Sequence, residues 1–263
     1  MNFPRIFILS ALIIYLPCQA FAWGMLGHRI VGEIAEDYLT RKANKEVRNI
    51  LGNESLAMAS NWADFIKSDS TYNYLGNWHY ANFMDNLDYE MLKVELEKEK
   101  GNNIYNRIQF LSSELKKGGL DPAKKKMYLR LLIHFVGDIH QPMHVGRKDD
   151  SGGNAIKISW FNEASNLHRL WDSDLIELQQ LSYTEYAKAI NFPSVAERQT
   201  WLNDDLSIWT YEGYVLSRKL YDTAKPDAKL GYRYNYDYLD TLNQQLLKGG
   251  LRLAGTLNRI FAN

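Results

Sequence analysis

Residues 131 to 144 read Leu131-Leu132-Ile133-His134-Phe135-Val136-Gly137-Asp138-Ile139-His140-Gln141-Pro142-Met143-His144, and they carry the strongest structural signal in the chain. His134 and Asp138 stand four residues apart, so on a helix their side chains lie on the same face. Their neighbours are apolar on nearly every side, which is typical of a buried helix. Burying an imidazole and a carboxylate is costly unless another group neutralises and binds them, as a divalent cation does. The stretch therefore predicts a buried helix that ends at Pro142 and forms the central wall of a metal site, with His144 in the loop that follows.

Composition allows one large domain and argues against a broad surface for nucleic acid. The chain has 263 residues, of which 46% are hydrophobic, and this is enough for a single large core. Its 31 basic and 31 acidic residues balance, whereas proteins that neutralise many phosphates are normally basic. If this protein binds phosphate, a metal ion must supply the attraction.

The first 22 residues have the features of a cleaved secretion signal. Arg5 is followed by an almost unbroken apolar run from Ile6 to Leu16, and Ala20-Phe21-Ala22 is a small-x-small cleavage site. The run is short for an uncleaved membrane anchor, which is the alternative. We expect removal of residues 1–22 to leave one domain, residues 23–263, without cysteine or membrane attachment. An exported protein of this size without disulfides indicates secretion to a bacterial periplasm or to the medium.

Most of the remaining chain shows helical periodicity. Asp121-Pro122 is typical of a helix start, because an N-cap residue precedes a proline at the first helical position. Alternation in Asn154–Trp160 predicts one strand of a hairpin. The other segments predict helices over 29–52, 105–115, 166–172, 183–190, 194–217 and 236–261, and a charged, solvated surface segment over 88–100. The predicted fold class is all-α, a single mostly helical domain with a small β-hairpin.

Candidate metal ligands recur in segments that are far apart in the sequence. Five of the six histidines and three carboxylates lie in such segments: His28, His79, His134, His144, His168, Asp64, Asp138 and Asp172. Taken singly, each histidine is more often a core or surface residue than a ligand. Imidazole and carboxylate without thiolate are, however, typical of catalytic zinc with open coordination positions. So many donors predict three ions that share a bridging carboxylate.

Cleavage after Ala22 would add a further donor. Trp23 would become the first residue, five positions before His28. A free α-amine has a pKa near ~8 and can bind a metal once deprotonated, with its own carbonyl closing a chelate ring. The new N-terminus is therefore a candidate ligand.

These motifs resemble those of the zinc-dependent nucleases of the S1/P1 family, over nearly all of the chain after residue 22. They appear in family order as Trp23-Gly24 with Gly27-His28, Trp62-Ala63-Asp64, Trp78-His79-Tyr80, the stretch from His134 to His144, Gly152-Gly153-Asn154, and Asn166-Leu167-His168 with Trp171-Asp172. The resemblance implies a helical fold of the phospholipase C/P1 nuclease type with three Zn²⁺ ions in a cleft. It implies these ligand sets: Asp64, His79, His134 and Asp138; His144, His168 and Asp172; and the amine and carbonyl of Trp23 with His28 and the bridging Asp138. His140 is the one histidine left over.

The resemblance also implies an activity. It is that of a secreted phosphodiesterase and endonuclease that hydrolyses single-stranded DNA and RNA to 5′-phosphate products, together with 3′-nucleotidase activity. Zinc can lower the pKa of bound water to ~7, so that a hydroxide attacks phosphorus in line. The implied catalytic residues are Asp64, Asp138 and Asn154. Asn154 is implied to contact phosphate, and Lys67, Tyr80 and Asn82 to contact the base. Some relatives carry Arg in place of Lys67 and Asp in place of Asn82, which leaves base preference open.

Three other interpretations compete. Zinc phospholipase C shares the fold, but its first ligand pair is more widely spaced than Trp23 and His28, and its last ligand is glutamate rather than Asp172. A secreted zinc-binding protein without catalysis would need closed, fully ligated sites. Histidines that only pack would leave two buried His-x-x-x-Asp pairs unexplained. We therefore expect a monomeric nuclease whose partners are single-stranded DNA, RNA and nucleotides, with no stable protein partner.

Overall fold

The computed structural model describes residues 23–98, 101–117 and 119–262, and the predicted central helix corresponds to α7 (Pro122–Asp138). Asp121 caps α7 by accepting hydrogen bonds from the backbone N–H groups of Ala123 and Lys124 at 2.9 and 3.2 Å. Every residue from Leu131 to Asp138 is buried. The predicted buried central helix is confirmed, but it ends at Asp138 rather than at Pro142, and Pro142 and His144 lie in a separate 3₁₀ turn. The signal-peptide prediction falls on residues 1–22, which lie outside the described residues.

Helices make up most of the described chain. Before α7 the chain forms α1 (Met25–Asp37), α2 (Arg41–Leu51), α3 (Leu56–Ala59), α4 (Trp62–Phe65), the 3₁₀ segments η1 (Ile66–Ser68) and η2 (Ser70–His79), α5 (Tyr89–Lys98) and α6 (Ile104–Lys117). After α7 it forms the 3₁₀ turn η3 (Pro142–Val145), β1 (Lys157–Trp160), β2 (Glu163–Asn166), α8 (Leu167–Arg169), the π-helical turn η4 (Leu170–Asp174), α9 (Leu175–Glu177), α10 (Tyr183–Ile190), α11 (Val195–Asn203), α12 (Leu206–Thr223), β3 (Lys229–Leu230) and α13 (Tyr232–Ile260). No described helix combines the length and the apolar character that crossing a membrane requires.

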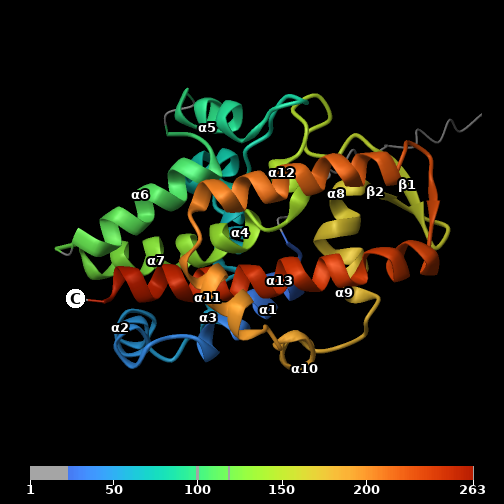
Figure 1. Ribbon diagram of the computed structural model, residues 1–263. Helices are drawn as coiled ribbons and strands as arrows, with labels where there is room; N and C mark the ends of the chain where they lie inside the picture. The colour runs from blue at the N-terminus through green and yellow to red at the C-terminus, as the bar shows by residue number, and fades with distance from the viewer. Residues whose placement is uncertain (1–22, 99–100, 118, 263) are drawn as a thin grey trace, which may run out of the picture.

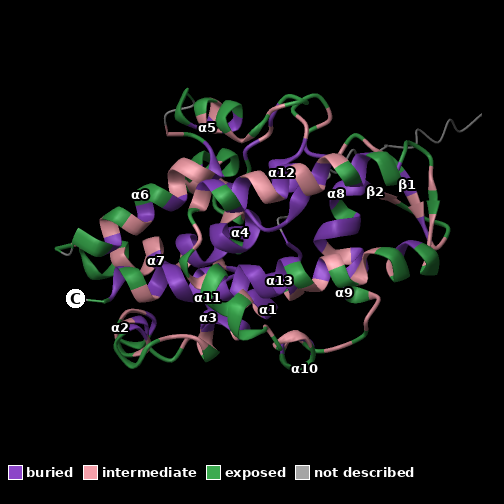
Figure 2. Ribbon diagram, in the orientation of Figure 1, coloured by how far each residue is buried: buried purple, intermediate pink, exposed green. Residues whose placement is uncertain are grey.

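The long helix α13 supports the elements that carry the site. It runs along most of the molecule and packs against α1 (Figure 1). A Cβ atom at Gly250 would lie 2.4 Å from Cγ2 of Ile34, so glycine is required for α1 and α13 to approach this closely. Buried residues gather around α1, α4 and the middle of α13 (Figure 2). The core therefore surrounds the C-terminal half of α7.

The predicted hairpin is present and belongs to a three-stranded sheet. β1 pairs antiparallel with β2, from Lys157 opposite Asn166 to Trp160 opposite Glu163. The two residues between the strands, Phe161 and Asn162, have φ angles of 48° and 70°, as a two-residue hairpin turn with left-handed backbone requires. The two-residue strand β3 pairs in parallel with the other edge of β1 and was not predicted.

Two predicted helices are each split in the structure, and one predicted surface segment is partly buried. The pattern over 29–52 is split into α1 and α2, because the Thr40 side chain accepts a hydrogen bond from Ala43 N and starts a new helix. The pattern over 194–217 is split at Asp204, which ends α11. The Oδ2 atom of Asp204 lies 2.6 Å from Nη2 of Arg252. The prediction of a solvated segment over 88–100 is wrong for one face, since α5 buries Leu92 and Leu96.

Candidate metal centre

The carboxylate of Asp138 lies at the centre of the histidine cluster and is fully buried. Its Oδ2 atom is 2.9 Å from Nδ1 of His79 and 3.1 Å from Nε2 of His134. Its Oδ1 atom is 3.2 Å from Nε2 of His28. The two oxygens therefore face different histidines, brought from α1, from the end of η2 and from α7. This is the arrangement that a carboxylate needs to bridge two ions.

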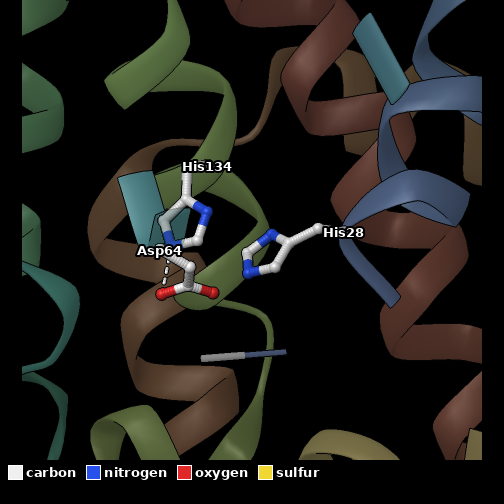
Figure 3. A group of neighbouring side chains, drawn as sticks. All are labelled: His28, Asp64 and His134. Carbon is white, nitrogen blue, oxygen red and sulfur yellow. Dashed lines mark ion pairs between the residues drawn. The ribbon is translucent and has the colours of Figure 1, made fainter. Parts of the chain in front are cut away.

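Asp64 approaches the same cluster from α4. Its Oδ1 atom is 3.8 Å from Nε2 of His134, and the His28 and His134 rings are stacked with centroids 3.9 Å apart (Figure 3). Donor atoms of His28, Asp64 and His134 lie within 4.8 Å of one another, as do those of His79, His134 and Asp138. The geometry thus groups His28 with Asp64 and His134, whereas the resemblance pairs it with Trp23 and Asp138. The distance of 3.2 Å between His28 Nε2 and Asp138 Oδ1 is compatible with His28 in either ligand set.

A separate group of donors lies between η3 and the π-helical turn η4. His168 Nε2 is 3.1 Å from one oxygen of Asp172, and His144 Nε2 is 3.7 Å from the other. Their donor atoms also lie within 4.8 Å of one another. Gln141 holds this carboxylate in place, because its amide donates to Asp172 Oδ1 while its oxygen accepts from the Met143 N–H. Gln141 lies in the stretch from His134 to His144, but its role could not be predicted from the sequence.

Backbone carbonyls orient three of the histidines. Nδ1 donates to a carbonyl oxygen in His134 (Ser60 O, 2.6 Å), His144 (His79 O, 2.7 Å) and His168 (Gly152 O, 2.7 Å). A neutral imidazole that donates from Nδ1 keeps its lone pair on Nε2, which is the atom that faces the carboxylates here. The leftover histidine behaves differently. His140 donates from Nδ1 to Val136 O and accepts from Arg252 at Nε2, so both of its nitrogens are used within the core.

The cluster fits zinc by its unpartnered atoms and by its donor types. Among the described residues, no hydrogen-bond partner exists for Nε2 of His79, Nε2 of His144 or Oδ1 of Asp138, although all three atoms are buried. Leaving buried polar atoms unpaired costs free energy, and a bound cation would remove that cost. Imidazole nitrogens and carboxylate oxygens without sulfur are suitable ligands for Zn²⁺. The residues present therefore fit the ion that the sequence predicts.

Burial and charge set the protonation of these groups in favour of metal binding. Burial lowers the pKa of His79 to about 4 and lowers the pKa of His28 below its ordinary value. Burial also acts on His134, but the charges of Asp138 and Asp64 outweigh it and raise the pKa of this imidazole. The pKa of Asp138 lies well below its ordinary value, because the neighbouring His134 and His144 outweigh the effect of burial. At neutral pH the central carboxylate is ionised and the His79 imidazole is uncharged.

A cleft of about 750 Å³ opens beside the cluster. His79, His144 and His168 line it, and so do all four predicted substrate-binding residues, Lys67, Tyr80, Asn82 and Asn154. Its described lining contains two lysines, Lys67 and Lys148, and no aspartate or glutamate. Sequence reasoning missed Lys148, Asn102 and Asn103, because they lie in turn-rich segments that carry no periodic signal.

The four predicted substrate-binding residues have different local partners. Lys67 Nζ is 2.6 Å from Oδ1 of Asp64, so this cation is already paired. Tyr80 donates its hydroxyl to Asn77 at 3.0 Å, and its ring stays partly exposed. Asn154 donates to Ser151 O at 2.8 Å. Asn82 also lines the cleft, and its buried Oδ1 atom has no hydrogen-bond partner in the described part of the chain.

Trp23 and Gly24 are anchored next to Asp138 and Asp172. Its side chain is fully buried, and its indole Nε1 donates to the carbonyl of Gly137, one residue before Asp138, at 2.7 Å. The next residue, Gly24, donates its N–H to the carbonyl of Asp172 at 2.7 Å. Residues 23 and 24 are therefore held beside the cluster.

Comparison with known proteins identifies the family. The S1/P1 nuclease profile matches residues 23–262. The chain belongs to the S1/P1 nuclease family. It is similar to Endonuclease 4 of Arabidopsis thaliana, with 31% identity covering 99% of this chain and 95% of that one. Nuclease S1 of Aspergillus oryzae is 28% identical, with 98% of each chain covered. Nuclease P1 of Penicillium citrinum is also 28% identical, with 90% of this chain and 97% of that one covered. Among solved structures, Alpha Toxin from Clostridium Absonum aligns with a TM-score of 0.49 at 16% identity, over 91% of this chain and 63% of that one.

One methyl group added at Gly137 of this S1/P1 nuclease would collide with a candidate ligand. A Cβ atom there would lie 2.8 Å from Nδ1 of His28. We expect Gly137→Ala to displace His28, to lower stability by about 1–3 kcal/mol as overpacking does, and to weaken metal binding. Urea unfolding and zinc content measure the two effects. Gly76→Ala is the matched control, because a Cβ atom there meets nothing within 4 Å. Equal stability of the two variants would contradict the expectation.

Proposed function

We propose that this protein is a zinc-dependent endonuclease that hydrolyses single-stranded DNA and RNA to 5′-phosphate products and also removes phosphate from 3′-nucleotides. The observation that carries the proposal is the position of the buried histidine and carboxylate groups beside a cleft whose described lining has lysines and no acids. A negatively charged phosphodiester enters such a cleft without repulsion from its walls. Membership of the S1/P1 nuclease family supports the reaction class.

The proposed cofactor is three Zn²⁺ ions. Asp64, His79, His134 and Asp138 would hold one, and His144, His168 and Asp172 a second. The Trp23 amine and carbonyl, with His28 and Asp138, would hold the third. When bound, zinc supplies a Lewis acid for phosphate oxygens and lowers the pKa of water toward neutrality.

The chain's own side chains position the substrate. Lys67, held 2.6 Å from Asp64, places a positive charge beside the cluster where a phosphate would bind. Asn154 lines the cleft with its amide fixed by the Ser151 carbonyl, and we assign it to a phosphate oxygen. The partly exposed ring of Tyr80 is available for stacking on a base, and we assign Asn82, which lines the same cleft, to a contact with that base.

The third zinc site requires a free amine at Trp23, and therefore removal of residues 1–22 and export of the protein. We expect a protein that begins with one extra alanine before Trp23 to lose about one zinc ion per chain, and most of its activity, because the amine moves away from His28 and Asp138. Metal analysis and nuclease assays of the two forms measure this. Full zinc content and full activity in the extended form would show that the amine is not a ligand.

The proposed function is tested with four substrates. Protein that begins at Trp23 is incubated with single-stranded DNA, RNA, a 3′-mononucleotide and phosphatidylcholine, with and without EDTA and added zinc. We expect EDTA-sensitive release of 5′-phosphorylated products from both nucleic acids and of phosphate from the mononucleotide. Cleavage of the lipid alone would replace the proposal with a phospholipase C activity. Zinc binding without any cleavage would indicate a storage protein.

A further inference from the structure

Aromatic rings lead away from the cleft along η2 toward α6 and α7. Tyr72 lines the cleft, and its ring is stacked with that of Tyr74 at 6.3 Å between centroids. Tyr74 meets Trp78 edge to face at 5.3 Å. Phe110 on α6 meets Tyr128 on α7 at 5.8 Å. We call these five residues the aromatic ridge.

Cations are interleaved with these rings. The guanidinium of Arg107 lies 4.0 Å from the centroid of the Trp78 ring and 5.6 Å from that of Phe110, so it joins the two halves of the aromatic ridge. The ammonium of Lys124 lies 5.4 Å from the centroid of the Tyr128 ring. Within the described ranges, neither cation has a carboxylate within 4.0 Å. Arg107 Nε is also buried without a hydrogen-bond partner there. The positive charges of Arg107 and Lys124 are therefore not neutralised by the acids that the structure describes.

Two rings of the aromatic ridge are open to solvent. Tyr74 is 52% exposed and contacts Trp78, and Phe110 is 38% exposed and contacts Arg107. Rings that only filled the core would be covered, as Phe135 is. The exposed faces are therefore available for stacking.

The aromatic ridge continues the surface of the cleft. The N–H of Ile104, the first residue of α6, donates to the carbonyl of Tyr80 at 3.2 Å. Asn102 and Asn103, just before α6, line the cleft, as does Tyr72 at the other end of η2. A chain that leaves the cleft along this side would meet the aromatic ridge directly.

We propose that the aromatic ridge binds the unpaired strand of DNA or RNA that extends beyond the nucleotide held in the cleft. Exposed rings alternating with unpaired cations suit bases and phosphates together, and this combination binds single strands without sequence preference. Paired bases inside a duplex cannot stack on these rings, so the aromatic ridge selects single strands. This inference rests on the proposed function, because the path of the strand is inferred from a nucleotide bound in the cleft.

The test compares substrates of different length. Zinc-loaded protein and the double variant Tyr74→Ala/Phe110→Ala are assayed on two-nucleotide and sixteen-nucleotide oligothymidylate. Binding of a fluorescein-labelled sixteen-nucleotide strand is followed by anisotropy. The matched control is Tyr236→Ala, which removes a ring that is 78% exposed and lies 5.6 Å from the Arg233 guanidinium, outside the aromatic ridge. Melting temperatures of all variants are compared to verify folding.

We expect the double variant to raise KM for the long strand at least ten-fold, since stacking on one ring contributes a factor of about 5 to 150. The kcat for both strands and the KM for the two-nucleotide substrate should not change. Arg107→Gln should lower the slope of log affinity against log salt by about 0.7. An unchanged KM for the long strand in the double variant, or an equal loss in Tyr236→Ala, would overturn the proposal.

Failure of the proposed function has a different signature. If the wild-type protein cleaves neither strand, the nuclease assignment fails. The anisotropy measurement still decides whether the aromatic ridge binds single strands, because it needs no cleavage. Equal affinity of the wild-type protein and the double variant would then reject the aromatic ridge separately.

Discussion

Removal of zinc with EDTA is expected to abolish activity and to lower the melting temperature of the protein by roughly 15 °C or more. A ligand present at a hundred times its Kd stabilises a protein by about 2.7 kcal/mol per site. The melting temperature of a domain of this size changes by about 2–4 °C for each kcal/mol of stability gained or lost. Three occupied sites therefore predict a large shift, and differential scanning calorimetry with and without EDTA measures it.

The physical reason is that the cluster is buried. Asp138 and His134 are fully buried, and Asp64 and Asp172 are nearly so. Without an ion, these carboxylates and the unpartnered atoms of His79 and His144 must be kept from water at a free-energy cost. The described residues contain no cysteine, so no disulfide compensates there. Restoring Zn²⁺ should restore the melting temperature, whereas Mg²⁺, which prefers oxygen ligands, should not. Identical melting of the metal-free and metal-loaded forms would reject this account.

Asp138→Asn is expected to lower kcat/KM for single-stranded DNA at least ~1000-fold. Its two oxygens face His28 on one side and His79 and His134 on the other. We expect the variant to weaken two ion sites at once. A loss of about 4 kcal/mol of transition-state stabilisation corresponds to a ~1000-fold lower kcat/KM. Metal analysis should show a fall from about three zinc ions to about one, the remaining ion being held at Asp172.

Asp174→Asn is the control for that variant. Asp174 is also buried and lies on the same turn as Asp172, but its carboxylate accepts from Ser165 at 2.5 Å and from Arg169 at 3.3 Å rather than from a histidine. It should keep full zinc content and activity within a few fold. An Asp138→Asn protein that retains three zinc ions would show that the Asp138 carboxylate does not bridge two of them.

The central helix could be predicted from the sequence, because its information is local. The i, i+4 spacing of His134 and Asp138, the apolar neighbours and the Asp121 cap all act within one element. The strand predicted over Asn154–Trp160 also rests on a local alternation, and the structure has it over Lys157–Trp160. The resemblance, rather than spacing, brought His28 and His79 to this helix, because no local pattern shows which distant segments meet.

The features that were missed depend on contacts between distant segments. Gln141 orients Asp172, which is 31 residues away. His140, left over in the sequence, meets Arg252 across 112 residues. The guanidinium of Arg107 lies over Trp78 only because α6 packs beside η2. β3 was missed because a strand of two residues has no alternation to detect.

The most direct test is anomalous X-ray scattering at the zinc edge, on crystals of the protein that begins at Trp23. The account predicts three peaks. One should lie among Asp64, His79, His134 and Asp138, one among His144, His168 and Asp172, and one between Trp23, His28 and Asp138. Absence of zinc from these groups, or zinc bound only elsewhere on the molecule, would contradict it.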